Sequence, residues 1–396
     1  MTRPSAAPAP AADRPISRRT LLRRTAALAA APWVAACDSP AQAPAAAGPA
    51  RLALLGEARW PHALPFGGTA LGGLSGADFD ARTGEYLLLS DDRADRGPVR
   101  FYTAEWPAQE PAPRLTGVVP LQQAGGTPWP NRRQAPPGVP VADPEALRLR
   151  PGTGTLLWST EGDVDRGFGP ALYESARDGR LLREFALPAM FRPDPSGGRG
   201  PRDNEGFEGL ATTPDGRFAW LAMEGALVQD GPLPTVDDAG GPCRFTQVDL
   251  AGGRAVRQIA YVPDAVPLRP AVPDTYADNG VSEALMIDAR RMLVLERAWA
   301  LGRGNSLRLY EIDTRAGSDT LALDTLRPGN HRPAPKRMLA DFARLGLARL
   351  DNTEALCWGP PLPDGRRRLL AVSDDNFNPT QITQFAVFAF TDPPSP

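Results

Sequence analysis

The chain has 396 residues and a formal net charge of −2, because 44 Lys and Arg residues nearly balance 46 Asp and Glu residues. This balance argues against a general nucleic-acid binder, so no nucleic-acid partner is expected. Only two histidines occur, His62 and His331, and both lie near proline in loop-like stretches, which disfavours a His-based zinc site or a Ser–His dyad. The sequence also has no Gly-x-Ser-x-Gly elbow, no phosphate-cradling glycine loop and no dinucleotide fingerprint.

The N-terminal segment has the pattern of an export signal. Residues 17–23 carry two adjacent arginines, and an apolar stretch follows at residues 26–36, so the segment resembles a twin-arginine signal. Residues 34–37 resemble a bacterial lipobox, which predicts a lipidated Cys37 at the mature N-terminus. The alternative is an ordinary cleaved signal in which the cysteine is incidental.

These patterns divide the chain into a signal peptide over residues 1–37, an Ala/Pro-rich linker over 38–50 and a single domain over 51–396. No other segment approaches the roughly 20 apolar residues that span a bilayer. We therefore expect an exported lipoprotein on the periplasmic side of the inner membrane, which contacts the membrane only through its lipid. A soluble periplasmic protein is the alternative, and a monomer is expected in either case.

After residue 50 the sequence repeats one plan five times. A short signature begins each copy, at residues 73–76, 145–147, 208–210, 283–285 and 354–356, with a period of about 70 residues. The third copy is the clearest, with β-rich runs at residues 208–213, 218–224, 245–250 and 255–261. A Pro-Asp-Gly turn joins its first two runs and a Gly-Gly turn its last two, which predicts four antiparallel strands, A to D.

The other copies follow the same order, with further runs at residues 86–89, 99–102 and 114–119; 155–159, 171–175 and 181–187; 292–296, 306–312 and 337–342; and 369–373 and 382–390. The last copy is one strand short, and residues 51–60 have strand character without belonging to a repeat. We expect these residues to pair beside 382–390 and close a ring. The prediction is an all-β, five-bladed β-propeller, with six blades if an insertion hides a degenerate copy. A β-sandwich would not explain the repeated signature.

Acidic residues recur at one predicted end of the ring. Strand A lines the channel of a propeller and B pairs antiparallel with it, so the start of A and the end of B share one end. The predicted A-starts carry Glu145, Glu208, Glu283 and Glu354, and Asn204, Asn279 and Asn352 precede three of them. The predicted B-ends carry Asp91, Asp92, Glu161, Glu224, Glu296, Asp374 and Asp375.

So many carboxylates need cations, arginine partners or raised pKa values. Oxygen ligands of this kind suit Ca²⁺. Arg93 and Arg297 directly follow two of the acids and could pair with them or hold an anionic substrate. The alternative is structural, with the A-start acids only accepting backbone N–H bonds from neighbouring blades.

Four stretches of the chain resemble the phytase-like family described as having the esterase-like activity of phytase. They are residues 73–76 with 90–92, residues 204–210, residues 281–283 with 293–297, and residues 351–354 with 373–377. The resemblance covers residues 51–392 and implies ester or phosphoester hydrolysis by an exported propeller. Ala146, Ala284 and Ala355 stand where the family usually has glycine, a difference expected to change packing more than chemistry.

Two functions follow from these patterns. The first is a Ca²⁺-dependent hydrolase of a small anionic ester or phosphoester, with Glu208, Glu283 or Glu354 as general base, the remaining mouth acids as metal ligands, and Arg93 and Arg297 on the substrate. The second is a non-catalytic, lipid-anchored propeller that binds a ligand or a protein partner in the cell envelope.

Overall fold

A computed structural model describes residues 52–107 and 109–392 of the chain. The predicted signal peptide, its Cys37 and the linker lie outside these residues. The described part contains twenty-two strands and four short 3-10 turns, η1 (Val164–Arg166), η2 (Ala189–Phe191), η3 (Val228–Asp230) and η4 (Phe342–Arg344). None of its helices is long and apolar enough to cross a membrane.

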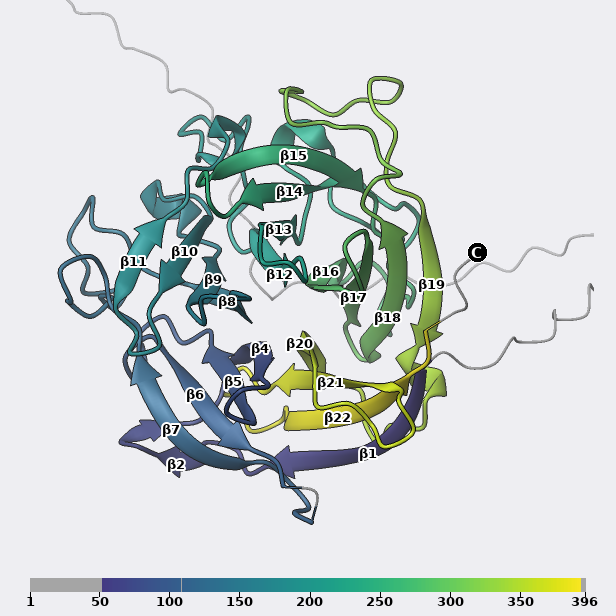
Figure 1. The fold of residues 1–396 in the computed structure, drawn as a ribbon. Coiled ribbons are helices and arrows are strands. Elements are labelled where there is room, and N and C mark those ends of the chain that lie inside the picture. The colour runs from purple at the N-terminus through teal and green to yellow at the C-terminus, as the bar shows by residue number, and fades with distance from the viewer. Residues whose placement is uncertain (1–51, 108, 393–396) are drawn as a thin grey trace, which may run out of the picture. The chain divides into compact units, whose positions relative to one another are not determined.

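Five four-stranded antiparallel sheets surround a central channel, as the five repeats predict (Figure 1). Blades 1 and 2 are β4 (Leu74–Asp80), β5 (Glu85–Ser90), β6 (Arg100–Glu105) and β7 (Arg114–Pro120), then β8 (Pro144–Leu149), β9 (Leu156–Thr160), β10 (Ala171–Ser175) and β11 (Leu181–Glu184). Blades 3 and 4 are β12 (Phe207–Thr212), β13 (Phe218–Met223), β14 (Cys243–Asp249) and β15 (Arg254–Tyr261), then β16 (Ala277–Met286), β17 (Arg291–Ala300), β18 (Gly304–Asp313) and β19 (Lys336–Asp341).

Blade 5 closes the ring with both ends of the described chain. Its strands are β20 (Asn352–Trp358), β21 (Arg367–Asp374), β22 (Thr383–Phe390) and β1 (Leu52–Trp60). Strand β1 pairs antiparallel with β22, from Leu52 opposite Phe390 to Trp60 opposite Thr383, which confirms the predicted closure. A two-stranded hairpin of β2 (Pro65–Phe66) and β3 (Thr69–Ala70) leads from β1 into blade 1.

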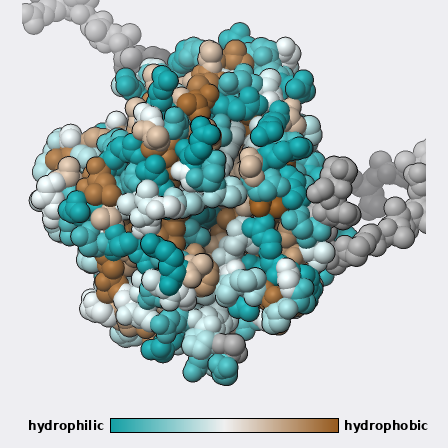
Figure 2. Space-filling view, in the orientation of Figure 1, coloured by the Kyte–Doolittle hydropathy of each residue, from teal (hydrophilic) through white to brown (hydrophobic). Residues whose placement is uncertain are grey.

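The burial of each strand depends on its place in the blade. Second strands such as β9 are buried along their whole length, because neighbouring blades cover both faces. The outermost strand β11 alternates between half-buried and exposed residues. Apolar side chains pack between blades, and Trp158 and Trp220 are among the largest that are fully buried. Figure 2 shows a mainly hydrophilic surface on which apolar residues are dispersed.

Candidate functional site

Each inner strand carries a β-bulge near the end of the channel where the strand begins. The residue that interrupts pairing with the second strand is Ser75, Glu145, Glu208, Ser282 or Glu354 in blades 1 to 5. The residue just before each bulge pairs with a residue of the second strand. The next residue along that second strand is Asp91, Glu161, Glu224, Arg297 or Asp374 in blades 1 to 5. Bulges re-aim side chains, and here they direct equivalent positions toward the same end of the channel.

Blade 4 departs from the predicted alignment by one residue. Its bulge residue is Ser282 and not Glu283, and Arg297 and not Glu296 follows the pair. The hydroxyl of Ser282 donates to the carbonyl of Thr353 in the next blade, just as Ser75 donates to Pro144. A shift of one residue turns a strand side chain to the opposite face. The predictions that Glu283 and Glu296 line the channel mouth are therefore wrong.

Glu283 instead forms a plug in the middle of the channel with Arg148 of blade 2. Nη2 of Arg148 lies 2.6 Å from Oε2 of Glu283, and both residues are fully buried. Arg148 also donates to the Ala77 carbonyl of blade 1 at 2.6 Å. Glu283 accepts the backbone N–H of Leu210 in blade 3 at 3.1 Å and of Leu356 in blade 5 at 3.5 Å. This one ion pair therefore contacts all five inner strands, and its role is structural.

Glu296 lies away from the mouth, in a network between blades 3 and 4. Its carboxylate accepts the hydroxyl of Tyr261 at 2.6 Å and the amide of Asn279 at 3.0 Å. It also pairs at 2.5 Å with Lys336, whose ammonium lies over the rings of Tyr261 and Tyr310. Asn279 lies with Glu296 and is not among the residues that line the mouth described below.

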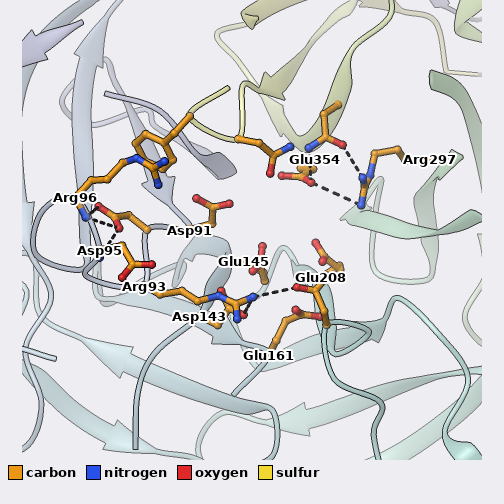
Figure 3. A pocket seen from close by; sticks show the side chains of 15 residues that line it. Asp91, Arg93, Asp95, Arg96, Asp143, Glu145, Glu161, Glu208, Arg297 and Glu354 are labelled. Atoms are coloured by element: carbon orange, nitrogen blue, oxygen red, sulfur yellow. Dashed lines mark hydrogen bonds and ion pairs between the residues drawn. The ribbon is translucent and has the colours of Figure 1, made fainter. Parts of the chain in front are cut away.

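Most of the remaining acids converge on a cavity of about 310 Å³ at the end of the channel where the inner strands begin, and Glu224, Asp374 and Asp375 lie just outside its lining. We call this cavity the acidic mouth (Figure 3). Its lining consists of eight carboxylates, three arginines, three asparagines and one aromatic residue: Asp91, Asp92, Asp95, Asp143, Glu145, Glu161, Glu208, Glu354, Arg93, Arg96, Arg297, Asn204, Asn352, Asn376 and Phe377. The predicted crowding of acids at one channel end is therefore present.

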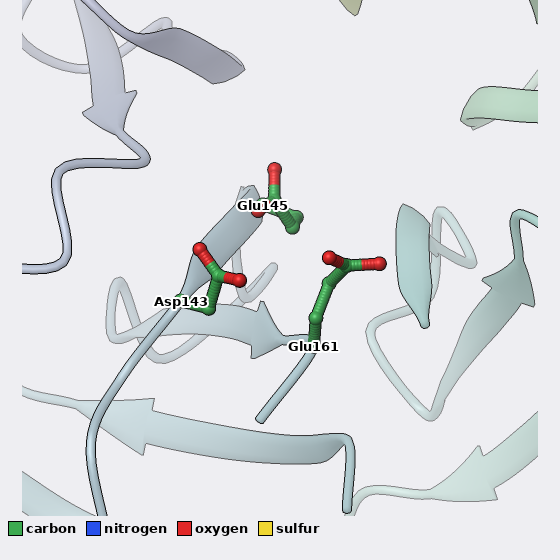
Figure 4. Close-up of side chains that lie close together, drawn as sticks. All are labelled: Asp143, Glu145 and Glu161. Carbon is green, nitrogen blue, oxygen red and sulfur yellow. The ribbon is translucent and has the colours of Figure 1, made fainter. Parts of the chain in front are cut away.

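Two overlapping groups of acids have the spacing of metal ligands. Oxygen atoms of Asp143, Glu145 and Glu161 lie within 4.8 Å of one another, and so do those of Glu161, Glu208 and Glu224. Figure 4 shows the first group, whose carboxylates point into one small volume. Glu161 belongs to both groups and is held by the backbone N–H of Gly206. A side chain at Gly206 would begin only 2.9 Å from the Cα of Glu161, so this approach requires glycine.

Glu208, like Asp91, is a mouth acid whose carboxylate the described part of the protein does not pair. It is 5% exposed, and among the described residues it has no hydrogen bond or ion pair. Burial raises its pKa well above the ordinary value, and the neighbouring carboxylates Glu224 and Glu161 raise it further. A buried carboxylate without partners is unfavourable, so this group needs either a proton or a cation.

Burial raises the pKa of the other mouth acids as well. It raises the pKa of Asp91 and Asp143 to about 7, although Arg93 opposes the shift in both. It raises the pKa of Glu161 and Glu224 to about 8. Near neutral pH these acids therefore keep part of their protons.

In the pairs Asp91-Asp92 and Asp374-Asp375, the first aspartate lies at the ring position and the second contacts a neighbouring loop. Asp92 is buried against Arg100 at 2.7 Å and accepts the backbone N–H of Asp95 at 2.8 Å, so it shapes the loop after β5. Asp375 is buried and contacts Nδ1 of His62 at 2.9 Å. Neither second aspartate is available as the predicted metal ligand.

Asp374 occupies the ring position of blade 5 but does not line the mouth. It is fully buried, and neither of its oxygens has a hydrogen-bond partner among the described residues. Burial raises its pKa well above the ordinary value, and nearby Asp91 and Glu354 add to the shift. It is a further buried acid that lacks a counter-charge.

Both predicted arginines line the mouth, and both are bound to acids. Arg93 pairs with Asp143 and donates to Asn204 at 3.0 Å. Arg297, which lies across the cavity from Arg93 in Figure 3, pairs with Glu224 at 3.1 Å and Glu354 at 3.6 Å. Their guanidinium groups therefore stabilise the acidic mouth itself.

Several mouth residues were not among the predicted site residues. Asp143 could have been found, because it directly precedes the inner strand that carries Glu145. Asp95, Arg96, Asn376 and Phe377 lie in loops whose path is set by tertiary contacts, so no sequence period marks them.

Fold and site together define a five-bladed β-propeller with an acidic mouth. Residues 69–377 match the Phytase-like family, described as "Esterase-like activity of phytase", and the chain belongs to that family. No curated protein matches the sequence.

Solved structures resemble the chain only distantly. A periplasmic gluconolactonase from Pseudomonas aeruginosa is 13% identical over 83% of this chain and 88% of its own, with a TM-score of 0.36. A thermostable family-43 glycoside hydrolase is 10% identical over 82% and 96%, with a TM-score of 0.44. Hydrazine synthase from Kuenenia stuttgartiensis is 12% identical over 81% of this chain, with a TM-score of 0.34, and the match spans 64% of that chain.

Proposed function

We propose that the acidic mouth binds a divalent cation, with Ca²⁺ as the best candidate, and hydrolyses a phosphate or carboxylate ester. The observation that carries this proposal is Glu208, which is buried in the mouth without a partner and lies within ligand distance of Glu161 and Glu224. Membership of a family described by esterase-like activity supports the reaction class.

The donor set fits Ca²⁺ in its chemistry. Six to eight oxygen ligands in flexible surroundings suit this ion, and eight carboxylates line the mouth. Asp143, Glu145 and Glu161 would hold the ion on the blade 2 side, with Glu224 as a further ligand from blade 3, which leaves Glu208 beside the ion. Bound there, the ion would supply Lewis-acid activation of the ester and of the attacking water.

Glu208 is the best candidate for the general base. Glu354 is the other remaining candidate, but its carboxylate already accepts the amide of Asn352 at 2.8 Å and pairs with Arg297. Glu208 has no such commitments, and its raised pKa brings it closer to the pH at which a base works best. Its place in the cavity allows it to take a proton from water beside the substrate.

Hydrolysis of p-nitrophenyl phosphate and p-nitrophenyl acetate, measured with Ca²⁺ and with EDTA, tests the proposal. We expect turnover that requires Ca²⁺ and falls about 10²–10⁴-fold in Glu208→Gln. Glu105→Gln is the matched control, because Glu105 ends β6 at the opposite end of blade 1 and pairs on the surface with Arg114. Ca²⁺ should also raise the melting temperature of the wild type, and raise it less in Glu208→Gln.

The same experiment decides between the enzyme and the binding protein. Stabilisation by Ca²⁺ without turnover of either ester would favour a non-catalytic propeller that binds a ligand in the envelope. If Ca²⁺ stabilised wild type and Glu208→Gln equally, the cation site proposed here would be wrong.

We also propose that the protein is exported as a monomeric lipoprotein held on the periplasmic side of the inner membrane. The support is the sequence pattern around Arg18, Arg19 and Cys37. Replacing both arginines by lysine should block export, and Cys37→Ser should release the protein from membranes. Cys37→Ser protein that stays with the membrane after a salt wash would contradict the lipid anchor.

A further inference from the structure

We infer that Arg96 is the group that binds the anionic part of the substrate. The inference rests on the proposed function and narrows it to esters that carry an anionic phosphate or carboxylate group at or beside the scissile bond. It assigns to Arg96 the role that the sequence suggested for Arg93 and Arg297.

Arg96 differs from the other two arginines of the mouth in its partners. Arg93 and Arg297 are bound by Asp143 and by the Glu224–Glu354 pair. Among the described residues, the guanidinium of Arg96 makes no hydrogen bond or ion pair, although eight carboxylates line the same cavity. Arg96 is an exposed residue at the rim, so its N–H groups remain available to a ligand that enters the mouth.

An aromatic platform holds this guanidinium. Its central carbon lies over the ring of Phe377, 4.4 Å from the ring centroid. Phe377 is the single aromatic residue of the cavity lining. A guanidinium that stacks through its face keeps its edge of N–H donors free, and that edge matches the paired oxygens of a phosphate or carboxylate.

Each partner is positioned by a buried aspartate behind its loop. Asp92 accepts the backbone N–H of Arg96 at 3.1 Å, and is itself fixed by Arg100. Asp375 accepts the backbone N–H of Phe377 at 3.0 Å. The second aspartate of each Asp-Asp pair therefore holds the loop that carries Arg96 or Phe377.

The platform is maintained at a conformational cost. Asn376 and Phe377 have φ values of 47° and 50°, and Ala94, in the loop that carries Arg96, has a φ of 60°. Residues other than glycine rarely adopt this left-handed region of φ, and those that do are often found at functional sites. The Phe377 ring fits because Gly72 leaves space, since a side chain there would begin 2.7 Å from the ring.

The test compares an anionic ester with a neutral one in the Arg96→Ala variant, at saturating Ca²⁺. A charged hydrogen-bonded contact is worth about 10- to 100-fold in binding. We therefore expect kcat/KM for p-nitrophenyl phosphate to fall about 10- to 100-fold, mainly through KM, with a change below about 3-fold for p-nitrophenyl acetate. Arg96→Lys should recover part of the loss, because it restores charge but not the planar donor edge.

Anion binding measured by calorimetry gives a readout without turnover. Inorganic phosphate and acetate are titrated into the Ca²⁺-loaded protein, and the tighter anion identifies the chemistry of the substrate group. Arg96→Ala and Phe377→Leu should both weaken binding of that anion. Arg82→Ala is the matched control, because Arg82 is exposed and pairs with Asp80 in the turn after β4, at the other end of the channel.

The outcomes separate this inference from the proposed function. If the wild type turns over either ester but Arg96→Ala binds anions and reacts unchanged, the role of Arg96 is wrong and the hydrolase stands. Equal losses for the charged and the neutral ester would also overturn it. If the wild type neither reacts nor binds either anion, both proposals fail.

Discussion

Glu208 and Glu283 begin the same sequence signature but lie in different surroundings in the structure. Glu208 faces the cavity without a partner, whereas Glu283 lies one residue further along its strand and is bound by Arg148 and by backbone donors. The difference comes from the bulge, which places Ser282 where blade 3 has Glu208. Residue type alone therefore could not separate a candidate site acid from a structural one.

The buried ion pair of Arg148 and Glu283 predicts how single substitutions change the free energy of unfolding. Arg148→Met should lower the free energy of unfolding by about 3–5 kcal/mol, because it leaves Glu283 buried without its cation. Glu208→Gln removes a carboxylate that its neighbours repel, so without added cation it should leave stability unchanged or raise it. Urea unfolding of the two variants measures both effects, and equal losses would contradict the assignment.

At the scale of strands, the sequence predicted most of the fold and part of the site. β-rich runs recur with a period of about 70 residues, and the strands lie where these local signals indicate. The position of each bulge depends on pairing between strands, which leaves no local signal. For this reason Glu145, Glu161 and Glu208 lie at the mouth as predicted, whereas in blade 4 the ring positions belong to Ser282 and Arg297 and not to Glu283 and Glu296.

In blade 4 the ring position is occupied by Arg297, and replacing this residue should lower the free energy of unfolding. Arg297→Gln deprives Glu224 and Glu354 of a shared partner. We expect a loss of about 2–3 kcal/mol, below the range for fully buried pairs because the Arg297 side chain is 18% exposed. Ca²⁺ should restore part of this loss in urea unfolding. A loss that is identical with Ca²⁺ and with EDTA would show that Arg297 does not share the acids with a cation.

Closure of the whole ring depends on the outermost strand of blade 5. Trp60 is 8% exposed, packs at 4.6 Å against Phe385, and donates to the carbonyl of Pro113 at 2.7 Å. Trp60→Ala should cost about 3–5 kcal/mol of unfolding free energy. Leu55→Ala on the same strand is the control, because Leu55 is 49% exposed, and its cost should stay within about 0.5 kcal/mol. Similar losses for both would contradict a closure held by the buried face of β1.

The acids of the mouth also make the stability of the whole molecule depend on pH. Burial raises the pKa of Asp91 and Asp143 to about 7 and of Glu161 and Glu224 to about 8. As pH rises from the ordinary carboxyl range toward 8, the unfolded chain has already released protons that the folded chain still holds. Stability without cation should therefore fall across this window.

Added Ca²⁺ should flatten this dependence, because an ion bound only by the folded state favours the ionised carboxylates. Melting temperatures between pH 5 and pH 8, measured with EDTA and with Ca²⁺, check the expectation. Two parallel curves would mean that the titrating acids and the cation do not share a site.

The Arg148–Glu283 plug closes the channel at its middle, so the acidic mouth opens at one end of the propeller only. The acidic mouth and the cavity at the other end of the channel, which Arg148 also lines, share no lining residue. A molecule that enters the mouth must therefore leave by the same route. A long polymer cannot thread through the ring, and could present only a terminus or a protruding side group to the acids.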